Sequence, residues 1–211
     1  LAGIKAAIEL MAEEITLSAE NKDILSKVIS EVRRIESLMK SLLDFARPPK
    51  PQFLQVNLNQ VLEGTMDFLI QQPSFSQSKK APIAIIQDLD AHLPEIVADP
   101  QQLRQIFINL LLNAHESMAN KGTITVKTSH DSNHAIEICI SDTGKGINKD
   151  ILDKLFQPFF TTKPKGTGLG LAITKQLIEQ HGGTISAENN PGGGAIFRIK
   201  IPIIQPEGIP G

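Results

Sequence analysis

Apolar residues in the first 47 positions recur at alternating spacings of three and four. One series is Leu1, Ile4, Ile8, Met11 and Ile15, and a second is Leu25, Val28, Val32, Ile35, Met39, Leu42 and Ala46. A repeat close to 3.5 residues predicts two helices that pack as a left-handed bundle. Polar residues 16–21 separate the two series, and Pro48 and Pro49 end the second helix because proline cannot continue it. The segment therefore predicts a helical hairpin.

The two helices of this hairpin differ in length. Residues 21–47 would span about 40 Å as a helix, whereas the first helix would span only about 25 Å. We therefore expect about ten further residues of the first helix before Leu1, in a longer parent chain. Because two helices with wide apolar faces bury them poorly alone, we expect a two-fold dimer with four helices. A coiled-coil linker or a dimerisation stalk is the alternative interpretation.

The pattern changes after residues 48–51, a short and stiff proline-rich boundary. Apolar alternation and turn residues predict strands at 55–58, 82–89, 95–98, 123–128, 135–141, 184–188 and 195–202. Helical spacing predicts helices at 58–70, at 100–119 and from about 168 to 181. Irregular alternation with adjacent hairpins predicts an α/β two-layer sandwich, in which helices cover one face of a mixed sheet. The predicted fold class is α+β, with a helical hairpin at 1–48 and a second domain at 52–205.

Composition and charge add few constraints. The chain is 41% hydrophobic and 21% charged with a net charge of −2, which indicates neither a nucleic-acid-binding nor a membrane-binding surface. We find no signal peptide and no run of about 18 apolar residues, so we expect a cytoplasmic location, with any membrane anchor upstream of Leu1. Cys139 alternates with isoleucines, which predicts a packed core thiol in a reducing compartment. A reactive thiol is the alternative.

Most of the candidate functional residues lie between positions 140 and 171. An apolar strand leads into the Gly-rich stretch 142–147, and a second Gly-rich stretch, 166–170, opens an apolar helix. Glycines let the backbone approach a ligand closely, and the free N–H groups at a helix start attract an anion. Asp142 stands at the end of the strand, beside this cradle for phosphates. The stretch therefore predicts a nucleotide site.

Two amides stand one helical turn apart among apolar residues of the predicted helix 100–119. Asn109 and Asn113 share one face because they are four positions apart. An unpaired amide in such a run costs about 1–3 kcal/mol, so each needs a partner. One interpretation is that both asparagines are structural and that their amides hydrogen-bond to the backbone. The functional one is that Asn113 coordinates Mg²⁺ that bridges phosphates, since Mg²⁺ needs few protein oxygens.

Four short motifs follow one another along the chain: Asn109 and Asn113, then Asp142-x-Gly144-x-Gly146, then Phe156 to Phe160, then Gly166-x-Gly168-x-Gly170. Their order and spacing resemble the N, first glycine, F and second glycine boxes of sensor histidine kinases. Those kinases share a Bergerat (GHKL) ATP-binding fold with gyrase, the heat-shock 90 chaperone and MutL. The hairpin resembles the family's dimerisation and phosphoacceptor bundle. Residues 1–4 resemble those that follow its phosphoacceptor histidine motif.

The resemblance implies a role for individual residues. Asp142 would accept the adenine amino proton, Asn113 would hold Mg²⁺, and Asn109 would line the same site. Lys163 and Lys165 would neutralise the phosphates of ATP. The base pocket and the start of a lid would be shaped by Gly144, Gly146 and Ile147. The phosphates would be wrapped by Gly166, Thr167, Gly168, Leu169 and Gly170. The lid would be anchored by Phe156, Phe159 and Phe160, for which core packing is the alternative.

Asn109 bears on the type of reaction. In the hydrolytic relatives a glutamate that activates water occupies this place, and an amide cannot act as a general base near neutral pH. The resemblance therefore implies transfer of the γ-phosphate of ATP to a histidine rather than hydrolysis. The histidines of this chain all lie outside the bundle helices, at His92, His115, His130, His134 and His181. We therefore expect the acceptor upstream of Leu1. His181 precedes two glycines at a helix end, where a cation is favoured, and is predicted to be structural.

The resemblance also implies partners and leaves alternatives open. A response-regulator receiver domain would take the phosphate on an aspartate, and the chain would form a homodimer through residues 1–48. One alternative is a conformational ATPase of the same superfamily, and another is a catalytically silent, nucleotide-sensing dimerisation module. Serine-directed anti-sigma kinases share the ATP fold but not the hairpin.

Overall fold

The computed structural model describes residues 3, 19–72, 75, 83–118, 121–130, 134–163 and 166–203, and the chain separates into two compact units, Leu1–Pro48 and Pro49–Gly211. The predicted first helix, residues 1–15, lies outside the described residues apart from Gly3. Lys165 lies outside them as well. None of the helices in the described ranges is both long enough and apolar enough to cross a membrane.

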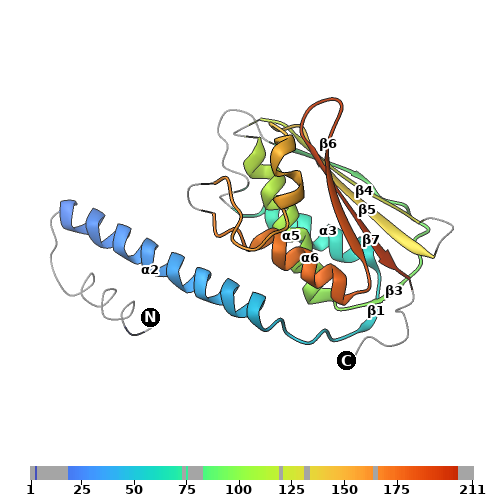
Figure 1. Ribbon diagram of the computed structural model, residues 1–211, viewed down its shortest axis with the longest axis horizontal. Coiled ribbons are helices and arrows are strands. Elements are labelled where there is room, and N and C mark those ends of the chain that lie inside the picture. The colour runs from blue at the N-terminus through green and yellow to red at the C-terminus, as the bar shows by residue number, and fades with distance from the viewer. Residues whose placement is uncertain are drawn as a thin grey trace. The chain divides into compact units, whose positions relative to one another are not determined.

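The first unit contains one long helix, α2, at Ala19–Ala46 (Figure 1). It covers the second of the two predicted helices. Its exposed ion pairs, Lys27–Asp23 and Arg34–Glu31, follow helical spacing and contribute little. A larger feature is a set of apolar side chains with exposed fractions between 41% and 65%: Ile24, Val28, Ile35, Met39, Leu42 and Leu43. Burying each such side chain would contribute about 1.5–3 kcal/mol, so α2 presents a surface suited to another helix.

The longer helices among the described residues of the second unit are α3 (Leu58–Ile70), α5 (Pro100–Ser117) and α6 (Gly170–Gln180). The Asn57 side chain caps α3 by accepting from the backbone N–H of Gln60. Asp99 caps α5, with Pro100 in the first turn, as the Asp-Pro pair predicts. A short 3₁₀ helix, η1 (Lys149–Lys154), was not predicted. It follows the first Gly-rich stretch.

Five strands form a mixed sheet in the order β2-β4-β5-β7-β6. They are β2 (Ala84–Asp88), β4 (Thr123–His130), β5 (Ala135–Asp142), β6 (Thr184–Asn189) and β7 (Ala195–Pro202). Only β2 and β4 pair in parallel; the other pairs of this sheet are antiparallel. β1 (Leu54–Val56) and β3 (Ile96–Ala98) form a separate antiparallel pair. The predicted α+β class and mixed sheet are confirmed.

Helices α3, α5 and α6 lie together on one face of the five-stranded sheet (Figure 1). The core lies between these two layers. Its fully buried side chains include Leu62, Met66, Leu103, Ile106, Phe107, Leu110, Leu111, Ile124, Ile136 and Ile138. Burial of this apolar surface is the main favourable term in folding. It holds the end of β5 rigidly against α5, and these two elements carry the predicted site residues Asp142, Asn109 and Asn113.

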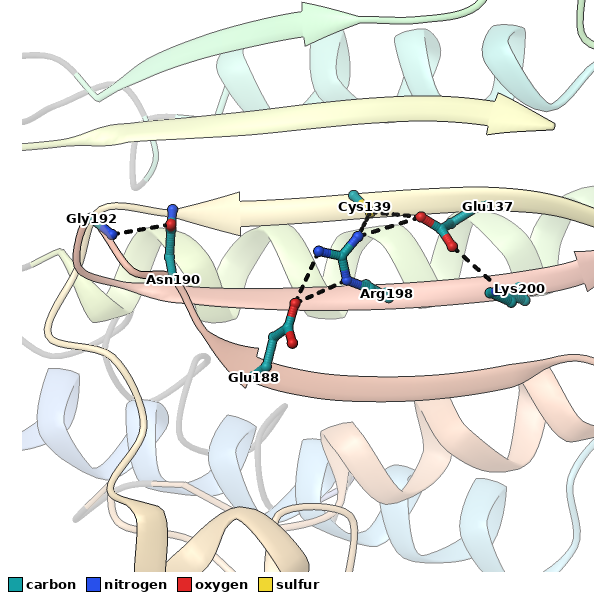
Figure 2. Close-up of polar contacts among 7 residues, drawn as sticks. All are labelled: Glu137, Cys139, Glu188, Asn190, Gly192, Arg198 and Lys200. Atoms are coloured by element: carbon teal, nitrogen blue, oxygen red, sulfur yellow. Dashed lines mark hydrogen bonds and ion pairs between the residues drawn. The ribbon is translucent and has the colours of Figure 1, made fainter. Parts of the chain in front are cut away.

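The opposite face of the sheet carries polar side chains (Figure 2). Arg198 on β7 pairs with Glu188 at 2.9 Å and with Glu137 at 3.4 Å, and its Nη1 lies 3.1 Å from the Sγ of Cys139. The prediction of Cys139 as a core thiol is wrong. Successive strand residues point to opposite faces, so Ile138 and Ile140 enter the core and Cys139 does not. Partial burial nevertheless raises the pKa of the Cys139 thiol, which disfavours the thiolate.

His181, just after α6, is fully buried and links two helices. Its Nε2 accepts from the backbone N–H of Asp99 at 3.0 Å, so Nδ1 must carry the proton that it donates to the Leu177 carbonyl at 2.7 Å. The edge of the Phe53 ring packs on it, with centroids 5.4 Å apart. Burial lowers the pKa of His181. The residue is structural as predicted, but it is a neutral imidazole rather than a cation at a helix end.

Acidification is therefore expected to destabilise this unit through His181. The unfolded chain takes up a proton on this residue near pH 6.5, whereas the folded chain does so only at lower pH. The free energy of unfolding should fall as the pH drops below about 6.5, by about 1.4 kcal/mol for each unit by which the pKa is lowered. Urea unfolding between pH 5 and pH 8 measures this slope.

His181→Gln should flatten the slope in that window, because the amide does not titrate, while lowering stability overall. His92→Gln is the matched control for the change of residue type, because the His92 side chain is 92% exposed and its exposed pair with Asp90 contributes little to stability. An equal slope for His181→Gln and the unmodified chain would contradict the assignment.

Candidate functional site

A cavity of about 300 Å³ opens where α5, the end of β5 and the start of α6 meet. Ten of the predicted site residues line it: Asn109, Asn113, Asp142, Gly146, Ile147, Lys163, Gly166, Thr167, Gly168 and Gly170. Gly144 and Leu169 do not. Gly144 lies beside Asp142 and bonds to it, and Leu169 is 2% exposed against the core. Asn109 and Gly170, which are 61 positions apart in the sequence, thus contribute to one concave site.

Asp142 is the last residue of β5 and is only 3% exposed. Its Oδ1 accepts from the backbone N–H of Gly144 at 2.8 Å and from the hydroxyl of Ser117 at 2.8 Å. None of the hydrogen bonds between described residues reaches Oδ2. A carboxylate oxygen that is held at a cavity wall can accept a hydrogen bond from an amino group in the cavity.

Asn113, Glu116 and Lys163 form a polar group at the cavity. Asn113 and Glu116 lie three positions apart on α5, so their side chains share a face. Lys163 Nζ lies 2.8 Å from Asn113 Oδ1 and forms an ion pair with Glu116. Lys163 lies in the segment between η1 and α6, 50 positions after Asn113 in the sequence. Two oxygen acceptors thus meet one cation at this point.

Asn109 joins α5 to the start of α6. Its Nδ2 donates to the Gly170 carbonyl and to the Thr174 hydroxyl, both at 3.3 Å. The amide is therefore satisfied, as a half-buried amide must be. This structural role and the position of Asn109 at the cavity wall are compatible.

The second Gly-rich stretch packs against the predicted lid anchors. Gly168 has a φ of 66°, a left-handed conformation that favours glycine, and an added Cβ would lie 2.6 Å from the Phe159 carbonyl oxygen. Phe159 itself has a φ of 65° and is 62% exposed. The exposed fraction contradicts core packing, the alternative for Phe159, whereas its predicted role as a lid anchor stays a prediction. Phe160 lines the cavity.

Gly168→Ala is expected to destabilise the unit by about 1–3 kcal/mol, because the new side chain demands both a strained φ and a shift of the Phe159 backbone. Thermal unfolding measures the loss. Gly64→Ala is the matched control. Gly64 lies inside α3 with no atom within 4 Å of an added Cβ, so alanine there should stabilise the helix by up to about 1 kcal/mol. Equal effects of the two substitutions would contradict the argument.

Several lining residues were not predicted as site residues: Leu112, Glu116, Ser117, Ile151, Leu155, Thr161, Thr162 and Leu171. Helical spacing could have identified two of them, because Glu116 and Ser117 follow Asn113 by three and four positions. Ile151, on η1, carries no such local signal. Ala195 also lines the cavity and brings no side-chain hydrogen-bonding group.

Comparison with known proteins identifies the family. Residues 98–205 match the model of the histidine kinase-, DNA gyrase B- and HSP90-like ATPases, and residues 1–51 match that of the His kinase A phosphoacceptor domain. The first match covers just over half of the chain and includes all of the predicted site residues. The chain therefore belongs to the histidine kinase-, DNA gyrase B- and HSP90-like ATPase family, and within it to the sensor histidine kinases. Its second unit carries the ATP-binding domain of that family.

Individual relatives agree with this assignment. The sensor histidine kinase ZraS of Salmonella typhi is 35% identical over 204 residues, which are 97% of this chain and 43% of the relative. The signal transduction histidine-protein kinase AtoS of Escherichia coli K12 is 36% identical over 208 residues, which are 99% of this chain and 33% of the relative. The chain thus spans less than half the length of these relatives. Among solved structures, full-length ShkA in complex with AMPPNP matches with a TM-score of 0.78 at 26% identity, over 95% of this chain and 43% of that one.

Proposed function

We propose that this chain is the ATP-binding and dimerisation part of a two-component sensor kinase that transfers the γ-phosphate of ATP to a histidine. Residues 1–48 would be the partial dimerisation and phosphoacceptor hairpin, and residues 52–205 the catalytic domain. Asp142 would accept a hydrogen bond from the adenine amino group. The two Gly-rich stretches would surround the base and the phosphates with backbone N–H groups.

The meeting of Asn113, Glu116 and Lys163 supports this proposal most directly. An amide oxygen and a carboxylate surround a cation there, and Mg²⁺ prefers such oxygen donors. Asn113 would hold Mg²⁺, with Glu116 next to it. Mg²⁺, when bound, would neutralise charge on the phosphates. Lys163 would move from Asn113 to the phosphate oxygens and stabilise charge that develops as the phosphoryl group leaves.

The environment of Asn109 favours transfer over hydrolysis. Its amide donates to Gly170 and Thr174, and it has no basic group with which to activate water. Two carboxylates belong to the described cavity lining. Of these, Asp142 is bonded to Ser117 and Gly144, and Glu116 is paired with Lys163. The nucleophile would be a neutral imidazole nitrogen brought in line with the γ-phosphate.

The exposed apolar side chains of α2 support a homodimer through residues 1–48. Side chains of this kind, repeated at heptad spacing, suit packing against a second copy in a four-helix bundle. The phosphohistidine would then pass its phosphate to an aspartate of a response-regulator receiver domain. This partner follows from the family assignment.

Phosphorylation with γ-labelled ATP and Mg²⁺ tests the proposed function. The chain should be compared with a version extended upstream of Leu1 through the expected histidine motif. Acid-labile, base-stable label on the extended version alone is the expected result. Steady release of free phosphate without labelled protein would contradict the proposal and favour a conformational ATPase. Nucleotide binding with neither product would favour a silent sensing module.

A further inference from the structure

Ser117 lies in the last turn of α5, where its hydroxyl has two acceptors within reach. One is the Ala114 carbonyl at 2.8 Å, three positions back on the helix, and the other is Asp142 Oδ1 at 2.8 Å. A serine hydroxyl has only one proton to donate. A hydrogen bond to an ionised carboxylate is about twice as strong as one between neutral groups, so the proton should point to Asp142.

The Ser117 and Gly144 donors together fix the rotation of the Asp142 carboxylate. Both bind Oδ1 at 2.8 Å, one from α5 and one from the loop after β5. A Cβ on Gly144 would lie 2.7 Å from Asp142 Oδ1 and would overlap the Ser117 hydroxyl, so the three residues are closely packed. With Oδ1 held in this way, Oδ2 is the oxygen left for a ligand in the cavity. If only one of the two donors bound the carboxylate, the group could rotate, and Oδ1 and Oδ2 could exchange positions.

We propose that Ser117 is a positioning residue that orients Asp142 and thereby sets the preference of the site for 6-amino purines over 6-oxo purines. This inference rests on the proposed ATP site. Adenine presents an amino donor at position 6, which pairs with Asp142 Oδ2. Hypoxanthine presents an oxygen at position 6 and a proton on N1. A fixed Oδ2 would face that oxygen, and two acceptors repel, whereas a carboxylate free to turn could reach the N1 proton.

Calorimetric affinities for ATP and for inosine triphosphate, measured on the whole chain, test the proposal. The unmodified chain should prefer ATP. Ser117→Ala should weaken ATP binding about tenfold, the lower end of the effect expected for a lost hydrogen bond to a charged group, and should change the affinity for inosine triphosphate much less. The ratio of the two affinities should therefore fall. Ser117→Thr, which keeps a hydroxyl, should restore most of the ratio.

Ser30→Ala is the matched control. The Ser30 hydroxyl on α2 bonds to the carbonyl three positions back, Lys27, at 2.7 Å, as Ser117 does to Ala114, but it has no carboxylate partner in the described part of the chain. Its removal should leave both affinities unchanged. Thermal unfolding of each variant reports whether it folds.

The outcomes separate this inference from the proposed function. No ATP binding by the unmodified chain would overturn both. ATP preference in the unmodified chain with an unchanged ratio in Ser117→Ala would overturn the role of Ser117 alone. An equal loss of affinity for both nucleotides would also overturn it, because that result indicates a structural effect on the whole site. A selective loss for ATP, reversed by threonine, would support it.

Discussion

Asp142→Asn is expected to lower ATP affinity about 100-fold, a loss of about 3 kcal/mol. Oδ1 accepts from both Ser117 and Gly144, so the amide oxygen of the new asparagine must take that place. Its NH₂ group then occupies the position of Oδ2 and points at the amino group of adenine. Two donors would face each other there, and neither would be satisfied beside a residue that is only 3% exposed. Calorimetric titration with ATP measures the loss.

The same substitution should reverse the base preference of the site. The new NH₂ group can donate to the 6-oxo group of hypoxanthine, so inosine triphosphate should bind Asp142→Asn better than ATP does. Asp150→Asn is the control, because this residue lies on η1 with an exposed side chain and is absent from the cavity lining. ATP affinity within threefold of the unmodified chain would show that Asp142 does not bind the base.

Asn113→Ala should abolish most phosphoryl transfer in the version extended upstream, with a rate loss of about 10²- to 10³-fold, the size seen when one stabilising group is removed from a reaction centre. Alanine removes the amide oxygen proposed for Mg²⁺ and leaves Lys163 with Glu116 alone. Labelling with γ-labelled ATP across a range of Mg²⁺ concentrations measures the effect. ATP affinity without Mg²⁺ should change less than threefold, since Asp142 and the Gly-rich stretches are untouched.

Gln101→Ala serves as the control for this experiment, because Gln101 is an exposed residue of the same helix and is not part of the cavity lining. Its rate should equal that of the unmodified chain. A rate for Asn113→Ala within tenfold of the unmodified chain at all Mg²⁺ concentrations would remove Asn113 from the proposed reaction. A selective loss that high Mg²⁺ partly restores would support a metal-binding role.

Local patterns were sufficient to predict the α-helices and strands that the structure describes, although they missed the short helix η1. The period of 3.6 in residues 58–70 and the Asp99-Pro100 start signal correspond to α3 and α5. Alternation correctly marked the strands, and the Gly-rich stretches marked the turns near the cavity. These signals are local because helix and strand periods, caps and turns depend on residues only a few positions apart. The candidate site residues were predicted from motifs, and their roles stay predictions.

The errors came from features that local patterns do not encode. Cys139 was assigned to the core because its neighbours are apolar, although strand alternation places it on the other face with Arg198. Core packing was the alternative for Phe159 because it is aromatic, but the residue is exposed and has a left-handed backbone. His181 was expected at a helix end where a cation is favoured, but burial of the imidazole lowers its pKa, and its Nε2 accepts from the backbone N–H of Asp99.

The sequence by itself determined the class of the fold, the family of the protein and the segments from which the site is built. Only the tertiary structure decided which side chains meet: Ser117 with Asp142 across 25 positions, Lys163 with Asn113 across 50 and His181 with Asp99 across 82. Such contacts form because burial of the apolar faces brings distant elements together, and each polar group that is buried with them must then find a partner. The partner depends on the packing of the layers, which no local pattern contains.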